Sequence, residues 1–355
     1  MPIDLFRVIL EKSTDVNVQE KDGHTPLHCA IIYNSEIAVN ELLRRQDVDV
    51  NLKNNNRQTT LHIASVKKDI SIDLFNMILK LSTDVNAQEK DGHTALHGAI
   101  GQENETVVGE LLQCKDVDFN IKNCASKTAL HFGALWKNIP VELFRVILEK
   151  STNVNAQDEV GTTALHWATF KQSTTAVEEL LKHKDVDVNL KNNQNQTALY
   201  IACAWKNIPI DLFKIILENS TDVNVQEEDG DTALHNAIVF EFETAIKELL
   251  ERKDIDVNIK NNNKRTPLHL ALMGKGFPIN LVILEKSTDV NAQEEDGDTA
   301  LHLAIMCKSK TALKELLKRR EIDFNLNNNK NQTARFLASL WEDMPIDLLS
   351  ILLEK

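Results

Sequence analysis

The chain has 355 residues, of which 42% are hydrophobic and 26% are charged. These fractions lie within the range of globular proteins and exclude a chain that is disordered throughout. Its 40 basic and 53 acidic side chains give a formal charge of −13, which disfavours sequence-independent binding to nucleic acid or to an anionic membrane surface.

The chain opens on MPIDLFRVILEK (1–12), whose amphipathic pattern predicts a helix and not a secretion signal. No apolar run approaches the roughly 20 residues that a membrane span needs. The five cysteines are odd in number and form no C-x-x-C pair, which disfavours a disulfide framework or a zinc knuckle. We therefore expect an intracellular, cytoplasmic protein without a membrane partner.

A six-residue phrase, T-x-L-H-x-A, recurs along the chain. Its copies begin at residues 25, 59, 94, 128, 163, 197, 232, 266 and 299, and a degenerate copy, TARFLA, begins at 333. Successive starts differ by 33 to 35 residues, mostly alternating between 34 and 35. The duplicated unit is therefore a pair of repeats, about 69 residues long.

Within one repeat, two short helices are predicted after the phrase begins. Thr94 stands where it can cap the first helix, and Leu96, Ala99 and Ile100 fall on one side of that helix. The apolar residues of 107–112 predict a second helix with a broad apolar face. Such a pair cannot bury itself alone, so we expect each repeat to pack against its neighbours in sequence.

The phrase and its period, followed by an E-L-L or V-I-L helix and then D-V-N, resemble the ankyrin repeat over residues 1–355. The resemblance implies an all-α repeat solenoid, with a hairpin finger and two antiparallel helices per unit stacked in a curved superhelix. We expect a single array over 1–355, in which ten complete helix pairs begin near the ten positions given above. Residues 1–22 are expected to form an N-terminal half repeat that contains the second helix only.

Two kinds of second helix alternate. The shorter reads TTAVEELLKHKDVDVN (174–189), and the longer, NIPVELFRVILEKSTNVN (138–155), has a proline near its start. One longer copy has lost two residues and gained two glycines, so residues 272–286 are predicted to be the softest joint. Neither end shows the polar face of a terminal cap, so we expect a segment of a longer array and possible association through the ends.

Eight histidines occupy the T-x-L-H position and invite a metal-binding interpretation. Successive repeats stack roughly 10 Å apart, whereas zinc ligands lie within about 2.1 Å of the ion. We therefore predict no metal site and a packing role, in which each partly buried imidazole bonds to the backbone of the adjoining finger. Recognisable catalytic and cofactor motifs are also absent from the sequence, so we predict neither an enzyme nor a cofactor.

The predicted finger tips alternate between acidic ones, such as QEEDGD (226–231), and Asn-rich basic ones, such as LKNNNRQ (52–58). Asn tolerates the left-handed conformation, so Asn-Asn is expected to replace Asp-Gly in these turns. Two interpretations stay open. Neighbouring fingers of opposite sign attract one another weakly, or the fingers form a charge-striped ledge that orients a partner.

In ankyrin arrays the two positions after T-x-L-H-x-A-x face the groove in which partners bind. By this resemblance, the predicted partner-binding residues are Tyr33, Trp136, Phe170, Trp205, Phe240, Met306 and Trp341. Aromatic side chains on such a surface suit a binding hot spot. The alternative for the three tryptophans is that they only cover the longer interhelical loop.

The sequence thus predicts a non-catalytic scaffold that binds another protein on its concave groove. A protein surface or extended segment with apolar anchors and some basic residues fits the acidic fingers. Two alternatives stay open: the targeting arm of a larger enzyme, toxin or effector, and a structural spacer.

Overall fold

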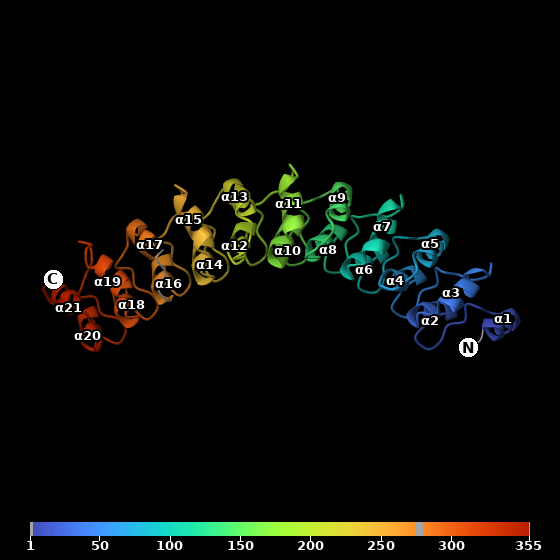
Figure 1. Ribbon diagram of the computed structural model, residues 1–355, viewed down its shortest axis with the longest axis horizontal. Coiled ribbons are helices and arrows are strands. Elements are labelled where there is room, and N and C mark those ends of the chain that lie inside the picture. Colours follow the sequence, from blue (N-terminus) through green and yellow to red (C-terminus); the bar gives the residue numbers. More distant parts are fainter. Residues whose placement is uncertain (1–2, 275–279, 355) are drawn as a thin grey trace. The chain divides into compact units, whose positions relative to one another are not determined.

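The structure is a computed structural model that describes the backbone of residues 3–274 and 280–354, and side chains from residue 7 onward except those of 275–281 (Figure 1). Within these ranges the regular elements are α-helices, and an isolated antiparallel bridge joins Asn327 to Thr333. The prediction of an all-α repeat fold is confirmed. The chain divides into two compact units, residues 1–187 and 188–355.

In the first unit, first and second helices alternate and form two rows (Figure 1). The helices are α1 (Ile3–Lys12), α2 (Pro26–Ile32), α3 (Glu36–Leu43), α4 (Thr60–Ser65), α5 (Ile72–Leu81), α6 (Ala95–Gly101), α7 (Glu105–Gln113), α8 (Ala129–Leu135), α9 (Val141–Lys150), α10 (Ala164–Lys171) and α11 (Thr174–Lys182).

The second unit repeats the same alternation. Its helices are α12 (Ala198–Ala202), α13 (Ile210–Asn219), α14 (Ala233–Val239), α15 (Glu243–Glu251), α16 (Pro267–Met273), α17 (Asn280–Lys286), α18 (Ala300–Met306), α19 (Lys310–Leu316), α20 (Ala334–Ser339) and α21 (Ile346–Glu354).

The phrase T-x-L-H is a reciprocal helix cap. At α6 the Thr94 hydroxyl accepts a hydrogen bond from the His97 backbone N–H (3.4 Å), while His97 Nδ1 accepts one from the Thr94 backbone N–H (3.1 Å). This places histidine where glutamate stands in the usual capping box. The Thr N–H to His Nδ1 bond recurs in all eight T-x-L-H copies.

The other ring nitrogen links one repeat to the next in His62, His131, His235, His269 and His302, whereas Nε2 of His28 and of His97 is buried without a hydrogen-bond partner among the described residues. His62 Nε2 lies 3.1 Å from the His93 carbonyl oxygen and His131 Nε2 lies 3.2 Å from that of Thr162. Since Nδ1 accepts, Nε2 carries the proton and donates to these carbonyls. The predicted bond to the adjoining finger is confirmed here, although the rings are buried and not partly buried as expected.

Packing between sequence neighbours forms the core of each unit. Helix α6 contacts α4 and α8, and α7 contacts α5 and α9. The second helices bury large side chains completely, including Phe75, Phe144 and Phe213. Because a fully buried side chain of this kind contributes roughly 1.5 to 3 kcal/mol, stability within each unit depends on contacts that a single repeat cannot make.

The D-V-N sequence at the end of each repeat supplies a second link. Asn86 Nδ2 donates to the Asp116 carbonyl oxygen (2.7 Å), and Asn86 Oδ1 accepts from the Asp118 N–H (2.8 Å). Asn17, Asn155, Asn224 and Asn291 make the same two bonds to the following repeat. One amide thus satisfies two backbone groups of its neighbour.

The fingers are fixed by one acceptor near the start of each turn. Glu227 Oε1 accepts from the Asp229 and Asp231 N–H groups, and Asn261 Oδ1 accepts from those of Asn263 and Arg265. The expected left-handed Asn-Asn turn is only partly right. The residues with positive φ in the Asn-rich fingers are Arg57, Ser126, Asn195, Lys264 and Asn331.

The predicted soft joint at 272–286 lies partly outside the described residues, because 275–279 are not described. On its far side α17 has seven residues, whereas the equivalent α13 has ten. The softness of the joint stays a prediction. So does the assignment of 1–355 to a single array with a half repeat at 1–22; α1 contacts α3, and its Ile9 is exposed.

Candidate binding surface

The ends of the first helices hold several large apolar side chains in solvent. In the first unit Tyr33 is 79% exposed and Phe170 is 62% exposed. In the second unit Phe240 and Met306 are 48% and 45% exposed. We call these side chains, with their exposed neighbours, the helix-end surface of each unit; the neighbours are Val66 in the first unit and Val239, Met273 and Leu340 in the second.

The prediction that the three tryptophans present an aromatic stripe to a partner is wrong. Trp136, Trp205 and Trp341 are only 4%, 5% and 6% exposed. Each follows the end of a first helix and accepts, through its carbonyl oxygen, a hydrogen bond from the residue three places on. They line the turn that leads to the longer second helix, so the alternative interpretation, that they cover this loop, describes them better.

A hollow lies beside Trp136 in the first unit. It has a volume of about 250 Å³ and is lined by Ile100, Gly101, Glu103, Phe132, Leu135, Trp136 and Lys171. The half-buried Phe132 ring forms one wall and packs edge-on to His93 at 5.4 Å between ring centroids. Four of the groove positions expected from the sequence, Gly101, Leu135, Trp136 and Lys171, therefore do converge on one concave feature.

Sequence reasoning missed Trp167. Its ring packs edge-on to Phe170 at 6.1 Å, and Lys127 Nζ lies 4.5 Å from its centroid. Its Nε1 donates to Asp158 Oδ2 at 2.9 Å. Trp167 and Phe132 both occupy the position after the phrase's histidine, one helical turn before the predicted groove positions, so this spacing was the available signal.

Several acidic side chains of the fingers accept hydrogen bonds from backbone N–H groups of their own turns. Glu227, Glu294 and Asp158 are buried and accept backbone N–H bonds within their own turns. Burial raises the pKa of Glu227. Ion pairs between neighbouring fingers include Arg265 with Glu294 at 3.3 Å and Lys127 with Asp158 at 3.9 Å. These carboxylates hold the fingers together and do not face solvent.

The residues at the tips of the second unit's acidic fingers are exposed instead. They are Glu228, Asp229, Glu295 and Asp296. At the tip, backbone N–H groups of one finger donate to carbonyls of the previous one, as from Asn262 to Asp229 at 2.9 Å. The main chain is thereby held in place while the carboxylates stay available to solvent.

The buried histidines are poor candidates for acid–base chemistry. Burial lowers the pKa of His28 to about 4 and that of His97 to about 3, so both are neutral near pH 7. Over residues 3–274 and 280–354, no three His, Cys, Asp or Glu side chains gather closely enough to hold a metal ion. Among the described helices, none combines the length and apolar character that crossing a membrane requires.

Comparison with known families gives matches along the whole chain. The family model for ankyrin repeats (three copies) matches residues 2–88, 66–158, 138–227, 204–293 and 276–355. These overlapping matches cover both units and follow the period of the T-x-L-H phrase.

Similar proteins come from a virus and from vertebrates. A putative ankyrin repeat protein of Acanthamoeba polyphaga mimivirus is 26% identical over 278 residues, 72% of this chain and 36% of that protein. The nuclear factor NF-kappa-B p105 subunit of Gallus gallus is 29% identical over 210 residues, 57% of this chain and 21% of the subunit. Neurogenic locus notch homolog protein 1 of Xenopus tropicalis is 27% identical over 203 residues, 53% of this chain and 8% of that protein. The match thus spans about a third or less of each relative.

Proposed function

The chain belongs to the ankyrin repeat family, whose repeats mediate protein–protein interactions, and we propose that it is a non-catalytic scaffold that binds a partner protein through the helix-end surface. The observation that carries the proposal is the exposure of large apolar side chains, such as Tyr33 and Phe170, at the ends of rigid, capped helices. Aromatic side chains held in this way bury a large area at low cost in conformational entropy.

The charges nearby indicate the character of the partner. In the second unit the exposed tips Glu228, Asp229, Glu295 and Asp296 accompany the apolar side chains Phe240 and Met306. A partner that offers apolar anchors with basic residues beside them complements this unit. In the first unit Lys67 and Lys171 stand among the helix-end residues, so contacts there are expected to be more mixed in charge.

Affinity capture with matched variants tests the proposal. A variant with Tyr33→Ala, Phe170→Ala and Phe240→Ala removes the three aromatic side chains. The control carries Ile37→Ala and Leu353→Ala, which truncate exposed apolar side chains on the second helices α3 and α21. We expect the native chain and the control to capture the same partner and the aromatic variant to lose it, with unchanged helical circular dichroism in all three. Equal capture by all three chains contradicts the proposal and favours a structural spacer.

A second candidate is the targeting arm of a longer protein, which the length of the relatives favours, since the matched segments make up 36%, 21% and 8% of them. Immunoblotting of the endogenous protein tests this candidate. A band well above 40.1 kDa supports it, and a band at that mass contradicts it.

A further inference from the structure

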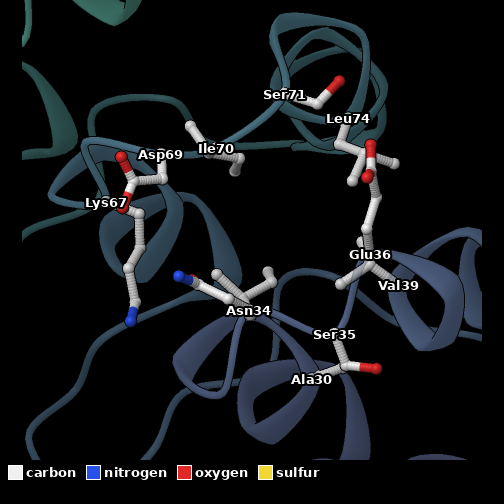
Figure 2. Close-up of a pocket in the computed structure, with 11 residues that line it drawn as sticks. Ala30, Asn34, Ser35, Glu36, Val39, Lys67, Asp69, Ile70, Ser71 and Leu74 are labelled. Atoms are coloured by element: carbon white, nitrogen blue, oxygen red, sulfur yellow. The ribbon is translucent and has the colours of Figure 1, made fainter.

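A cavity of about 170 Å³ lies between the first two complete repeats (Figure 2). Its apolar lining comes from Ala30, Ile31, Val39, Ile70 and Leu74. Polar side chains of Glu36, Asp69 and Ser71 stand at its rim, and the Lys67 side chain extends along one side (Figure 2). The cavity therefore combines an apolar interior with several hydrogen-bonding groups at its mouth, as ligand sites do.

Lys67 occupies the position that tryptophan holds in the next longer-type repeat. The two residues are 69 positions apart (136 − 67), which is one period of the repeat pair. The Lys67 N–H donates to the Ala64 carbonyl at 3.2 Å, and the Trp136 N–H donates to the Gly133 carbonyl at 3.2 Å. Trp205 and Trp341 make the same bond to the residue three positions earlier. The four residues therefore occupy equivalent positions of the backbone.

The surroundings of the two positions also correspond. Three buried residues beside the cavity have buried equivalents one period, 69 residues, later. Ala30 corresponds to Ala99, Ile31 to Ile100 and Val39 to Val108. The carbonyl oxygens of Lys67 and Trp136 each accept a hydrogen bond from the following repeat. Asn104 Nδ2 donates to the Lys67 carbonyl, and Ser173 Oγ donates to the Trp136 carbonyl. The equivalent backbone therefore carries a buried indole in one repeat and borders an open cavity in the other.

The two repeats differ in the side chain at this position, which is lysine in one and tryptophan in the other. The Trp136 ring is buried, and Ile139 beneath this turn is 2% exposed. Lys67 instead directs its Nζ to the Ile32 carbonyl oxygen at 2.6 Å, away from the space between the helices, and Ile70 remains half-buried. The lysine cannot fill the volume that an indole fills elsewhere in this chain.

We propose that this cavity is a binding site for an indole ring, supplied as a tryptophan side chain by a partner protein. A cavity of about 150 Å³ with apolar walls is large enough to take up benzene, and the equivalent position in this chain already accommodates indole. Glu36, Asp69 and Ser71 offer oxygen acceptors for the indole N–H, which usually needs a partner when buried.

The inference goes beyond the proposed helix-end interface, because free indole can test the cavity without any partner protein. The native chain, labelled with ¹³C at its Ile, Leu and Val methyl groups, is titrated with indole and separately with the tripeptide Gly-Trp-Gly. We expect saturable shifts of the methyl signals of Ile31, Val39, Ile70 and Leu74 with both probes. The methyl groups of Val108 and Ile139, which lie one period after Val39 and Ile70 and are buried, serve as the internal control and should not move.

Two outcomes of the titration overturn the proposal. The first is the absence of shifts at the cavity methyl groups, or equal shifts at the control methyl groups. The second is a response to free indole without a response to the tripeptide, which assigns the cavity to a small molecule instead of a partner's side chain.

Substitution gives an independent test. Lys67→Trp should fill the cavity from within, weaken indole binding at least tenfold and raise the midpoint of thermal unfolding. Lys68→Trp, which places the same ring on the exposed neighbouring residue, should leave binding unchanged. Undiminished binding to a folded Lys67→Trp chain contradicts the proposal, and the methyl titration of the native chain decides the matter if that variant does not fold. Phe170→Ala should not affect indole binding, so failure of the helix-end interface can be told apart from failure of the cavity.

Discussion

The two ends of the first helices follow different rules. Every first helix begins after a threonine, and eight carry the reciprocal threonine–histidine cap. At the other end the corresponding residues are Tyr33, Lys67, Gln102, Trp136, Lys171, Trp205, Phe240, Gly274, Cys307 and Trp341. The start is constrained by hydrogen bonds within the helix and, in several repeats, by a hydrogen bond to the next repeat, whereas the end is constrained in only some repeats.

This contrast separates scaffold from recognition. A side chain that satisfies buried backbone groups cannot change without leaving a polar atom unpaired. A side chain in solvent can differ from repeat to repeat at little cost in stability, which makes the helix ends the place where contacts with a partner can be specified. Perturbing each end in turn tests the contrast.

Acid should disrupt the helix starts together and has the largest expected effect. Burial holds the pKa of His28 at about 4 and that of His97 at about 3, below the ordinary value of 6.5. Between the folded pKa and 6.5, each of these histidines binds more protons in the unfolded chain than in the folded one. Stability is therefore retained above pH 6.5 and lost as the pH falls below it. At pH 5 each of these two histidines favours unfolding by about 2 kcal/mol. Urea unfolding followed by circular dichroism should show a lower midpoint at pH 5 than at pH 7.

The control for the acid experiment is a variant with His28→Asn and His97→Asn. Its stability should depend less on pH over the same interval, although it will be less stable at pH 7 because two caps are lost. Burial also lowers the pKa values of His62, His131, His235 and His269, so part of the dependence should remain. An equal pH dependence in the variant and the native chain contradicts the interpretation.

The finger that leads into α6 gives the next largest effect. Gly92 has φ +78°, and a Cβ atom there would lie 2.8 Å from the Cys124 backbone nitrogen of the next finger. Gly92→Ala should therefore destabilise the chain by about 2 to 3 kcal/mol. Gly109→Ala is the matched control, because this helical glycine has nothing within 4 Å of the position of a Cβ atom; it should stabilise by about 0.5 to 1 kcal/mol. Urea midpoints that fall equally for both variants would show that the close approach of the fingers is unimportant.

The sequence predicted the elements that depend on periodicity. The recurrence of T-x-L-H-x-A located the first helices, and the breadth of the apolar faces correctly indicated packing between neighbours. The histidine role followed from an elementary distance argument, since side chains one repeat apart cannot meet at one ion. The reciprocal bond from His Nδ1 to the threonine N–H could not be predicted, because spacing alone does not give the orientation of the ring.

The sequence misplaced the tryptophans because position along a helix does not determine side-chain direction once the helix has ended. Trp136 stands in a turn, in which its carbonyl oxygen accepts a hydrogen bond from the Ile139 N–H and Pro140 follows. Its ring is buried. The cavity beside Lys67 was accessible to sequence comparison, because aligning the chain with itself at 69 residues places Lys67 opposite Trp136. Its volume and its rim required coordinates.

The smallest effects are expected from single substitutions at the two ends of one helix, α2. Thr25 is buried, and its hydroxyl accepts from the His28 N–H at 3.3 Å, so Thr25→Ala should destabilise by about 1 kcal/mol. Tyr33 at the other end is 79% exposed, so Tyr33→Ala should change the free energy of unfolding by less than about 0.5 kcal/mol. Urea unfolding of both variants measures the difference. A Tyr33→Ala effect as large as that of Thr25→Ala would mean that the helix end also carries the stability of the repeat, and a side chain with that burden could not vary freely to suit a partner.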